Sequence, residues 1–359
     1  MIMLKLKFII FFIVLLFLYV NSYAIDSILL AKANDYSVTI PLLLAGRNTT
    51  GSNISTVNLT TFTQSVSLTT TLNANLGAGS IDTTNNVGYF CSNGSSKPIQ
   101  ISKIDLENLI EIDKMELSGS FYACKNMLID IDKQLLFVLS TSGTMGIIKI
   151  DLDSFEKTGQ TTTSIGVGVG FVFNPDKTII YWGVTTFGPT INIRRTYTLN
   201  MSSAGSDITV GTGVAGSAIS DGTYIYFSTD SSSYGFKIFK IDMSTFSLIS
   251  TYSSSCMSES NSAVVDPYNT YGYFYSGAGN NGLLKVDFSN FNGGESCLNL
   301  TVGLGTSLVY NNSKNDKIYI GSGNVPCKID KIDVNSFTED SSITLTGSNN
   351  TACTSMSLY

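Results

Sequence analysis

An all-β fold, a seven-bladed β-propeller of four-stranded antiparallel blades, is the architecture that the sequence predicts. Three observations lead to it: a short motif that recurs at a near-constant interval, apolar segments of strand length between turn residues, and no helical periodicity between those segments. The seven copies of the motif begin 45 to 47 residues apart. A single supersecondary unit used seven times accounts for such a period.

The motif is clearest at Lys149-Ile150-Asp151, directly before a turn. Four other close copies begin at Lys103, Lys240, Lys285 and Lys331, and two weaker ones begin at Thr56 and Arg195. We expect the repeated aspartate to be structural, because a carboxylate before a turn accepts hydrogen bonds from backbone N–H groups, as in Asx turns. Catalytic carboxylates come as one or two special residues instead. The repeated aspartates are Asp105, Asp151, Asp242, Asp287 and Asp333.

The third copy illustrates the four strands of a blade. Phe121 to Ile129, Gln134 to Leu139 and Gly146 to Leu152 are predicted as the first three strands, and a shorter fourth one follows. Apolar residues succeed one another in the third strand, as at Ile147 and Ile148, where a half-exposed sheet would alternate apolar and polar residues. Blades packed face to face around an axis bury both sides of each sheet, which favours a propeller.

Large residues recur at two places in the unit. The second strands carry pairs such as Tyr89-Phe90, which we expect between adjacent blades. Trp182 occupies the same place, so a core position is favoured over sugar stacking. Six places after each motif start we expect wedges that pack the outer blade: Phe62, Leu109, Phe155, Met201, Phe246, Phe291 and Phe337. Small residues in first strands, as at 77–79, 166–168 and 215–217, are expected where strands crowd near the axis.

The first 24 residues have the features of a secretory signal peptide. Lys5 and Lys7 precede an apolar run from Phe8 to Val20, and small residues at positions 22 and 24 predict cleavage after Ala24. A retained membrane anchor needs about 20 apolar residues, more than this run provides. We therefore expect a signal peptide at 1–24, a single β-propeller domain at 25–359, and a secreted, extracellular protein with no membrane span after cleavage.

The two ends of the propeller are expected to share one blade. The first blade has a clear second strand from Ser37 to Leu44 but a poor first strand before it. The segment from Ala352 to Tyr359 matches the other first strands, so it is predicted to complete that blade and remove the open edges. Six and eight blades are the alternatives, and six is disfavoured because seven third strands are present.

Six cysteines indicate disulfides and an oxidising compartment. No pair has zinc-ligand spacing and the sequence has no histidine, so we expect no metal site. Six cysteines allow fifteen pairings. Cys91 and Cys124, and Cys327 and Cys353, stand in a similar relative phase from one blade to the next. We predict those two pairs, which leaves Cys256 with Cys297 by elimination.

Eight Asn-x-Ser/Thr sequons are potential glycosylation sites in an exported chain, and we expect several but not all to be used. They are Asn48, Asn53, Asn58, Asn93, Asn200, Asn299, Asn311 and Asn349. Those at Asn48, Asn53, Asn93 and Asn349 are expected in loops of one face, where glycans would leave the sector over blades three to six bare.

The segment from Ile148 to Phe155, and the stretch from Ala263 to Pro267 with Gly272 to Phe274 after it, resemble extracellular YVTN-type and amine-dehydrogenase-like β-propeller repeats. The resemblance runs from about Ser37 to the C-terminus. It implies the blade architecture but no particular function, because propellers of this kind bind proteins, bind sugars or catalyse reactions. The fourth copy departs, with Arg195-Thr196-Tyr197 in place of Lys-Ile-Asp, and marks a place where the repetition is relaxed.

The leading functional prediction is a secreted, glycosylated recognition module that is not an enzyme and needs no cofactor. It would bind an extracellular protein or glycan on the bare sector, with Phe187, Arg194 and Tyr234 as ligand-binding residues. A nucleic-acid partner is not expected, because the sequence shows no basic stripe. A histidine-free extracellular hydrolase or lyase, and a structural matrix component, are the alternatives.

The placement of acidic residues separates these functions. Asp130, Asp132, Asp176 and Asp266 are expected in turns between first and second strands, away from the middle of the channel, so no catalytic residue is assigned. Two carboxylates at one channel mouth would favour an enzyme, whereas a channel lined only by small residues would favour binding or a structural role.

Overall fold

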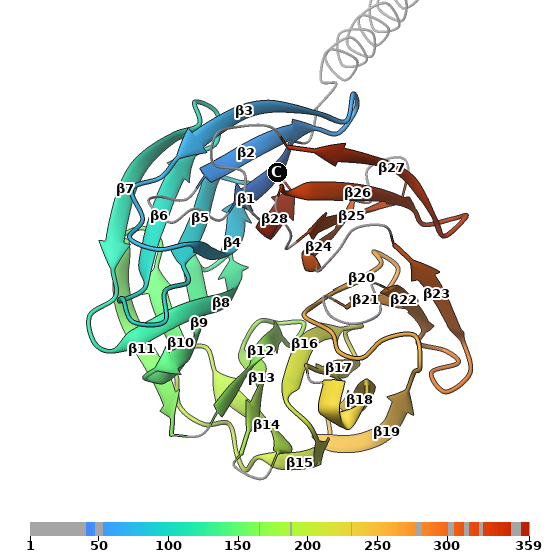
Figure 1. The fold of residues 1–359 in the computed structure, drawn as a ribbon. Coiled ribbons are helices and arrows are strands. Elements are labelled where there is room, and N and C mark those ends of the chain that lie inside the picture. Colours follow the sequence, from blue (N-terminus) through green and yellow to red (C-terminus); the bar gives the residue numbers. More distant parts are fainter. Residues whose placement is uncertain are drawn as a thin grey trace, which may run out of the picture. The chain divides into compact units, whose positions relative to one another are not determined.

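Seven four-stranded antiparallel sheets stand as blades around a central opening in the computed structural model (Figure 1). The structure describes residues 41–46, 53–164, 166–186, 189–230, 232–276, 282–300, 305–311, 316–322, 326–345 and 353–358. The seven-bladed propeller prediction is confirmed. The predicted signal peptide lies outside the described residues. Within these ranges, no helix has the length and apolar character needed to cross a bilayer.

Each blade is a meander whose first strand is innermost. Blade 1 consists of β28 (Cys353–Leu358), β1 (Pro41–Gly46), β2 (Asn53–Asn58) and β3 (Thr63–Thr69). Blade 2 consists of β4 (Leu76–Asp82), β5 (Val87–Ser92), β6 (Gln100–Asp105) and β7 (Ile110–Glu116). Blade 3 consists of β8 (Phe121–Asp130), β9 (Leu135–Gly143), β10 (Met145–Asp151) and β11 (Glu156–Thr163). Blade 4 consists of β12 (Gly166–Phe173), β13 (Ile179–Thr185), β14 (Thr190–Tyr197) and β15 (Ile208–Thr212).

The remaining blades repeat this order. Blade 5 consists of β16 (Ala215–Ser220), β17 (Tyr224–Thr229), β18 (Lys237–Asp242) and β19 (Ser247–Ser253), with a 3-10 turn η1 (Ser232–Tyr234) between β17 and β18. Blade 6 consists of β20 (Ser262–Val265), β21 (Tyr271–Tyr275), β22 (Gly282–Asp287) and β23 (Glu295–Asn299). Blade 7 consists of β24 (Gly305–Asn311), β25 (Lys317–Ser322), β26 (Lys328–Asp333) and β27 (Thr338–Thr344).

The ring closes as predicted, because the C-terminal strand β28 pairs antiparallel with β1. The register places Leu44 opposite Met356 and Gly46 opposite Cys353. The predicted second strand of this blade begins at Ser37, and its residues before Pro41 lie outside the described part of the chain. Hydrogen bonding of the last strand to the first leaves no open edge between the ends of the propeller.

Adjacent blades are held together by aromatic residues at the predicted wedge positions. The Phe155 ring of blade 3 packs on the Tyr89 ring of blade 2 with centroids 6.0 Å apart. Phe246 packs on Tyr181 in the same way, at 5.8 Å. Burial of these large side chains between the sheets supplies much of the apolar contact that stabilises the ring.

The basic residue of the motif lies over the same aromatic pairs. Lys103 places its Nζ 5.5 Å from the centre of the Phe155 ring. In the relaxed fourth copy Arg195 takes this role, with its guanidinium carbon 3.9 Å from the centre of the Phe246 ring. Such cation–π contacts explain why the repeat keeps a basic residue at this place.

The repeated aspartates are turn residues, as predicted. The Asp105 carboxylate accepts a hydrogen bond from the Glu107 N–H at 2.8 Å, and the Asp242 carboxylate accepts one from the Ser244 N–H at 2.8 Å. Hydrogen bonds from the side chains of Asn108 and Ser244 are the largest cause that lowers the pKa values of Asp105 and Asp242.

The fourth copy builds its turn differently, because Tyr197 stands where five copies have an acceptor carboxylate and the first has the Asn58 amide oxygen. The backbone closes the turn instead: the Met201 N–H donates to the Tyr197 carbonyl, and the Tyr197 N–H donates to the Ser202 carbonyl, both at 2.9 Å. Trp182 of this blade is 1 % exposed, and its indole N–H donates to Thr196 Oγ1 at 3.0 Å. The core interpretation of the tryptophan is therefore confirmed.

Small residues occur where the innermost strands cross closely, as predicted. A Cβ at Gly168 in β12 would lie 2.3 Å from the Ala215 carbonyl oxygen of β16. No side chain fits in so short a distance, so the approach of these two strands requires glycine.

The three predicted cysteine pairs are the pairs at disulfide distance. Cys91–Cys124 joins blade 2 to blade 3, with Cα atoms 6.1 Å apart. Cys327–Cys353 ties blade 7 to the closing strand β28, with Cα atoms 5.0 Å apart. Cys256–Cys297 links the segment after β19 to β23, with Cα atoms 6.0 Å apart. Three disulfides are consistent with an extracellular protein.

Candidate functional site

A cavity of about 180 Å³ opens at the centre of the ring, between the beginnings of the innermost strands. Its walls come from β4, β8, β16, β20, β24 and β28, so nearly every blade contributes. The wall residues are Gly77, Ala78, Gly79, Lys125, Asn126, Ser217, Ala218, Asn261, Ser262, Ala263, Ser307, Leu308 and Met356. Small residues leave the space open, and hydroxyl and amide groups make it polar.

Lys125 is the charged residue among those that line the cavity, and a β-bulge places it there. In the pairing of β8 with β9, Cys124 stands opposite Ser140 and Asn126 stands opposite Leu139, so Lys125 is an extra residue. The equivalent bulge of β4 carries Gly77. Bulges of this kind redirect a side chain out of the sheet. A lysine therefore reaches the channel at a place where the neighbouring blade carries a small residue.

Asp230 and Glu259 lie on the same face of the ring, at the ends of two adjacent segments. Asp230 directly follows β17, and its N–H donates to the Val214 carbonyl at 2.8 Å. Glu259 precedes β20 and the cavity residue Asn261. The Ser260 N–H donates to the Thr229 carbonyl at 2.8 Å, which ties the segment of Glu259 to the segment of Asp230.

A buried network of hydroxyl groups lies close in the chain to the two carboxylates. Ser217, Ser228 and Ser260 belong to adjacent strands and loops of blades 5 and 6, and Ser217 Oγ lies 2.9 Å from Oγ of each of the other two. Because all three side chains are at least 95 % buried, the backbone that carries Asp230 and Glu259 is held in one arrangement.

The pKa of Asp230 is raised to about 6. Burial is the largest cause, and the negative charge of Glu259 adds to it, whereas the positive charge of Lys125 lowers the pKa. Asp230 belongs to blade 5 and Lys125 to blade 3, so the interaction joins residues of two blades that are not neighbours. A carboxyl group with a pKa near 6 can exchange a proton close to neutral pH, as a general acid or base must.

Other acidic residues stand elsewhere, as predicted. Asp130 and Asp132 lie at the turn after β8, where both bind Lys177, at 3.3 and 2.9 Å. Asp266 accepts a hydrogen bond from the Tyr271 N–H at 2.8 Å in the corresponding turn of blade 6. These carboxylates shape turns at the opposite end of the innermost strands from the cavity.

Potential metal ligands come close together at one place within the described ranges, and it is not the cavity. Cys256, Cys297 and Glu295 bring their ligand atoms within 4.8 Å of one another. The two cysteines form a disulfide, so they are not available as thiolates.

Two of the three predicted ligand-binding residues lie in the part of the chain that the structure describes, and their role in binding stays a prediction. Phe187 lies outside the described residues. Arg194 is on β14 rather than in a loop, and its Nε–H donates to Asp207 at 2.8 Å. Its guanidinium carbon also lies 5.6 Å from the centre of the Trp182 ring. Tyr234, in η1, is 40 % exposed.

The sequons differ in how well they could carry a glycan. Asn48 and Asn349 lie outside the described residues. Asn200 and Asn299 are exposed, and Asn53, Asn58 and Asn93 are half-buried. Asn311 is 8 % exposed at the end of β24, which makes it the least suitable acceptor of those described.

Sequence reasoning missed Lys125, Asp230 and Glu259, although two of them carried a signal. Asp230 follows its second strand at a register where the other copies have Asn93, Ser140, Thr185, Gly277 and Gly323. Lys125 interrupts a first strand at the place of small residues in other blades. Both are departures from a repeat, and departures point to function more directly than the repeat itself does. Glu259 lies in an irregular connection, where the repeat offers no reference.

Solved structures with the same fold match nearly the whole chain, while no family model and no curated protein matches it. One is a “putative 6-phosphogluconolactonase” from Bacteroides uniformis, with a TM-score of 0.67 and 15 % identity, covering 89 % of this chain and 100 % of that one. A protein of the same description from Bacteroides fragilis has a TM-score of 0.67 and 13 % identity, covering 90 % and 99 %.

A third match is the dihydro-heme d1 dehydrogenase NirN, with a TM-score of 0.61 and 10 % identity, covering 89 % of this chain and 75 % of that one. At these identities the likeness shows the fold alone. The prediction of a recognition module without catalytic activity is nevertheless corrected, because the matching propellers are described as enzymes.

Proposed function

We propose that this protein is a histidine-free hydrolase that opens small lactones in the central cavity. The observation that carries the proposal is that Asp230 interacts electrostatically with Glu259 and with Lys125, a lysine that lines the polar cavity. A carboxyl group that is coupled to a second carboxylate and to a lysine of the cavity wall favours an enzyme over a binding module. The lactonase description of two fold neighbours supports the choice of reaction.

Asp230 is the general base of the proposed reaction. Its carboxylate takes a proton from a water molecule, and the water oxygen attacks the carbonyl carbon of the lactone. The negative charge that develops on the carbonyl oxygen is stabilised by the Lys125 ammonium, with the amide of Asn261 as a further donor in the same wall. When the ring C–O bond breaks, the leaving oxygen takes the proton from Asp230, so one water is consumed and one hydroxy acid is formed.

Glu259 adjusts the basicity of Asp230. Its charge raises the pKa of Asp230 toward the working pH, which strengthens the base without leaving it protonated at neutral pH. We therefore expect the rate to rise as the pH increases through about 6 and then to level off.

The charge around the cavity favours a substrate without a phosphate group. Lys125 is the charged residue among the described wall residues, and it interacts electrostatically with Asp230, as Glu259 also does. A phosphate dianion would be repelled by both carboxylates. An uncharged lactone of a sugar acid suits the hydroxyl and amide groups of the wall better than a 6-phospho lactone does.

A pH-stat assay with glucono-δ-lactone, corrected for spontaneous hydrolysis, tests the proposal. We expect Asp230→Asn to lower kcat by about 10²- to 10⁴-fold, as loss of a general base does. Asp132→Asn is the matched control, because that carboxylate is 83 % exposed in a turn on the opposite face. The proposal is wrong if the wild-type protein does not exceed the spontaneous rate with this and other uncharged lactones, or if Asp230→Asn is as active as the control.

We also propose that the protein is exported and glycosylated, and that it belongs to the YVTN-type or amine-dehydrogenase-like repeat family. The disulfides support an oxidising compartment. Mass spectrometry of the native protein tests export and glycosylation together: we expect an N-terminus at Ile25 and glycans at exposed sequons such as Asn200. An extracellular protein or glycan partner, without nucleic acid, stays a prediction.

A further inference from the structure

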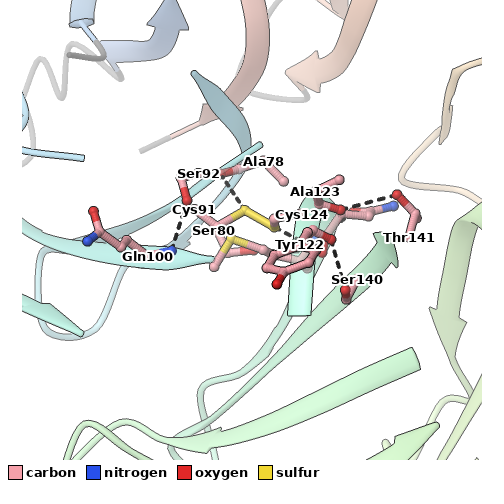
Figure 2. Close-up of a disulfide and its surroundings, with 12 residues drawn as sticks. Ala78, Ser80, Cys91, Ser92, Gln100, Tyr122, Ala123, Cys124, Ser140 and Thr141 are labelled. Carbon is pink, nitrogen blue, oxygen red and sulfur yellow. Dashed lines mark hydrogen bonds between the residues drawn. A yellow bond between two sulfur atoms is a disulfide. The ribbon is translucent and has the colours of Figure 1, made fainter. Parts of the chain in front are cut away.

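The residues before the Lys125 bulge are anchored on both sides. The Cys91–Cys124 disulfide joins them to β5 of blade 2, and the Ala123 N–H donates to the Gly94 carbonyl of the same blade at 2.9 Å. From within blade 3, Thr141 Oγ1 donates to the Ala123 carbonyl at 3.2 Å, and Ser140 Oγ donates to the Tyr122 carbonyl at 2.9 Å (Figure 2).

The backbone between these anchors has an unusual conformation. Ala123 has a φ of 53°, in the left-handed region that residues other than glycine rarely adopt. The carbonyl of Cys124 approaches β4 so closely that a Cβ at Gly77 would lie 2.0 Å from its oxygen. The strained residue Ala123, the close contact with Gly77 and the disulfide at Cys124 therefore all involve the two residues directly before Lys125. Such strain persists only where the surrounding structure over-determines it.

We propose that the Cys91–Cys124 disulfide is a positioning element of the cavity site, which fixes the start of the bulge and thereby holds the Lys125 ammonium in the cavity wall. The disulfide is a covalent cross-link between blades 2 and 3, which thermal motion does not open. Both cysteines are fully buried, so the bond needs no access to solvent for this role. The inference deepens the proposed function, because it assigns a residue pair that acts through Lys125 in the same site.

The closing blade offers a matched control. In β28, Cys353 stands opposite Gly46 and Ser355 stands opposite Ala45, so Thr354 is the extra residue of a bulge directly after a disulfide cysteine. The chain thus has two bulges of the same construction. One carries a lysine and the other an uncharged residue. Removal of the Cys327–Cys353 disulfide loosens an equivalent bulge without moving a charge.

The readout is the pKa of Asp230, measured from the ¹³C chemical shift of its carboxyl carbon as the pH changes. The Asp230→Asn variant assigns that signal. Lys125→Met removes the positive charge and should raise the Asp230 pKa by roughly 0.5 to 1. Cys91→Ser with Cys124→Ser should raise it by a similar amount, whereas Cys327→Ser with Cys353→Ser should leave it unchanged. The triple variant of both cysteines and Lys125 should show no larger change than Lys125→Met alone, because both act through the same ammonium.

The inference is overturned if the Cys91 and Cys124 variant titrates like the wild type while Lys125→Met does not, or if Lys125→Met has no effect. An equal change in both disulfide variants would also overturn it, since that indicates general loosening. Cys91→Ala with Cys124→Val keeps an apolar pair in the buried site and replaces the serine variant if the latter does not fold. The readout requires no turnover, so an absence of lactone hydrolysis would end the proposed function and leave this test intact.

Discussion

The rings of Tyr89 and Phe155 pack 6.0 Å apart at an angle of 42°, although one belongs to the second strand of blade 2 and the other to the outer turn of blade 3. Phe155 is 8 % exposed and has a φ of 53°. The same left-handed conformation recurs at the wedge positions Phe62, Leu109, Met201, Phe246 and Phe337. The backbone of each such residue is strained, and the packing of its side chain on the neighbouring blade stabilises it. The contact between blades therefore determines the conformation of the turn.

Substitution of this wedge should separate packing from backbone strain. Phe155→Ala should lower the free energy of unfolding by about 3–5 kcal/mol, through the lost ring contact and the cavity that it leaves. Phe155→Gly should be less destabilising by about 1 kcal/mol, because glycine adopts positive φ without strain. Urea denaturation of the two variants measures the difference. A Phe155→Gly variant clearly less stable than Phe155→Ala would show that strain at this turn is negligible.

Asp230→Asn should stabilise the protein at neutral pH while it removes activity. The folded pKa of about 6 lies above the unfolded value of 3.8, so the carboxyl group favours folding below pH 4 and loses that contribution as the pH rises to 6. Above pH 6 the variant should be more stable than the wild type by about 1–3 kcal/mol. Chemical denaturation at pH 4 and at pH 8 measures this. A stability difference that is the same at both pH values would contradict the raised pKa.

The Lys317–Asp333 pair should show the opposite dependence on pH. Lys317 Nζ lies 2.5 Å from the Asp333 carboxylate, and this hydrogen bond is the largest cause that lowers the Asp333 pKa to about 2. The stabilisation is therefore present above about pH 4 and lost as the pH falls through 2. We expect Asp333→Asn to cost about 1 kcal/mol at pH 7, since solvent screens the partly exposed pair. Denaturation at pH 7 and pH 2 should find a much smaller cost at pH 2.

The Cys327–Cys353 disulfide should govern the closure of the ring. We expect Cys327→Ser with Cys353→Ser to cost about 2–4 kcal/mol. Hydrogen exchange should become faster in β1 and β28, because the pairing from Leu42 to Gly46 then depends on hydrogen bonds alone. Amides of blade 3 serve as the internal reference. Acceleration of similar size throughout the propeller would mean that the disulfide stabilises the whole fold rather than its closure.

The repeat made the fold predictable down to single contacts. Strands, turns, wedge residues and closure follow from local patterns that recur seven times. An assignment made in one copy can therefore be compared with the same position in the other copies. The disulfides followed as well, because two cysteine pairs stand in a similar relative phase from one blade to the next and the third pair remains by elimination. The candidate site was not predictable in the same way, because Lys125, Asp230 and Glu259 belong to three different blades and share no motif.

The sequence alone therefore determined the structure of the repeated blade and the number of blades. Strand periodicity, turn residues and spacing are local properties, and they recur in every copy. Only the tertiary structure decided which of the residues that depart from the repeat interact with one another. Whether Lys125 acts on Asp230 depends on the curvature of the ring, the bulge in β8 and the burial of a loop after β17. Those quantities come from the packing of seven sheets against one another, and electrostatic interaction depends on the resulting distances and burial rather than on separation along the chain.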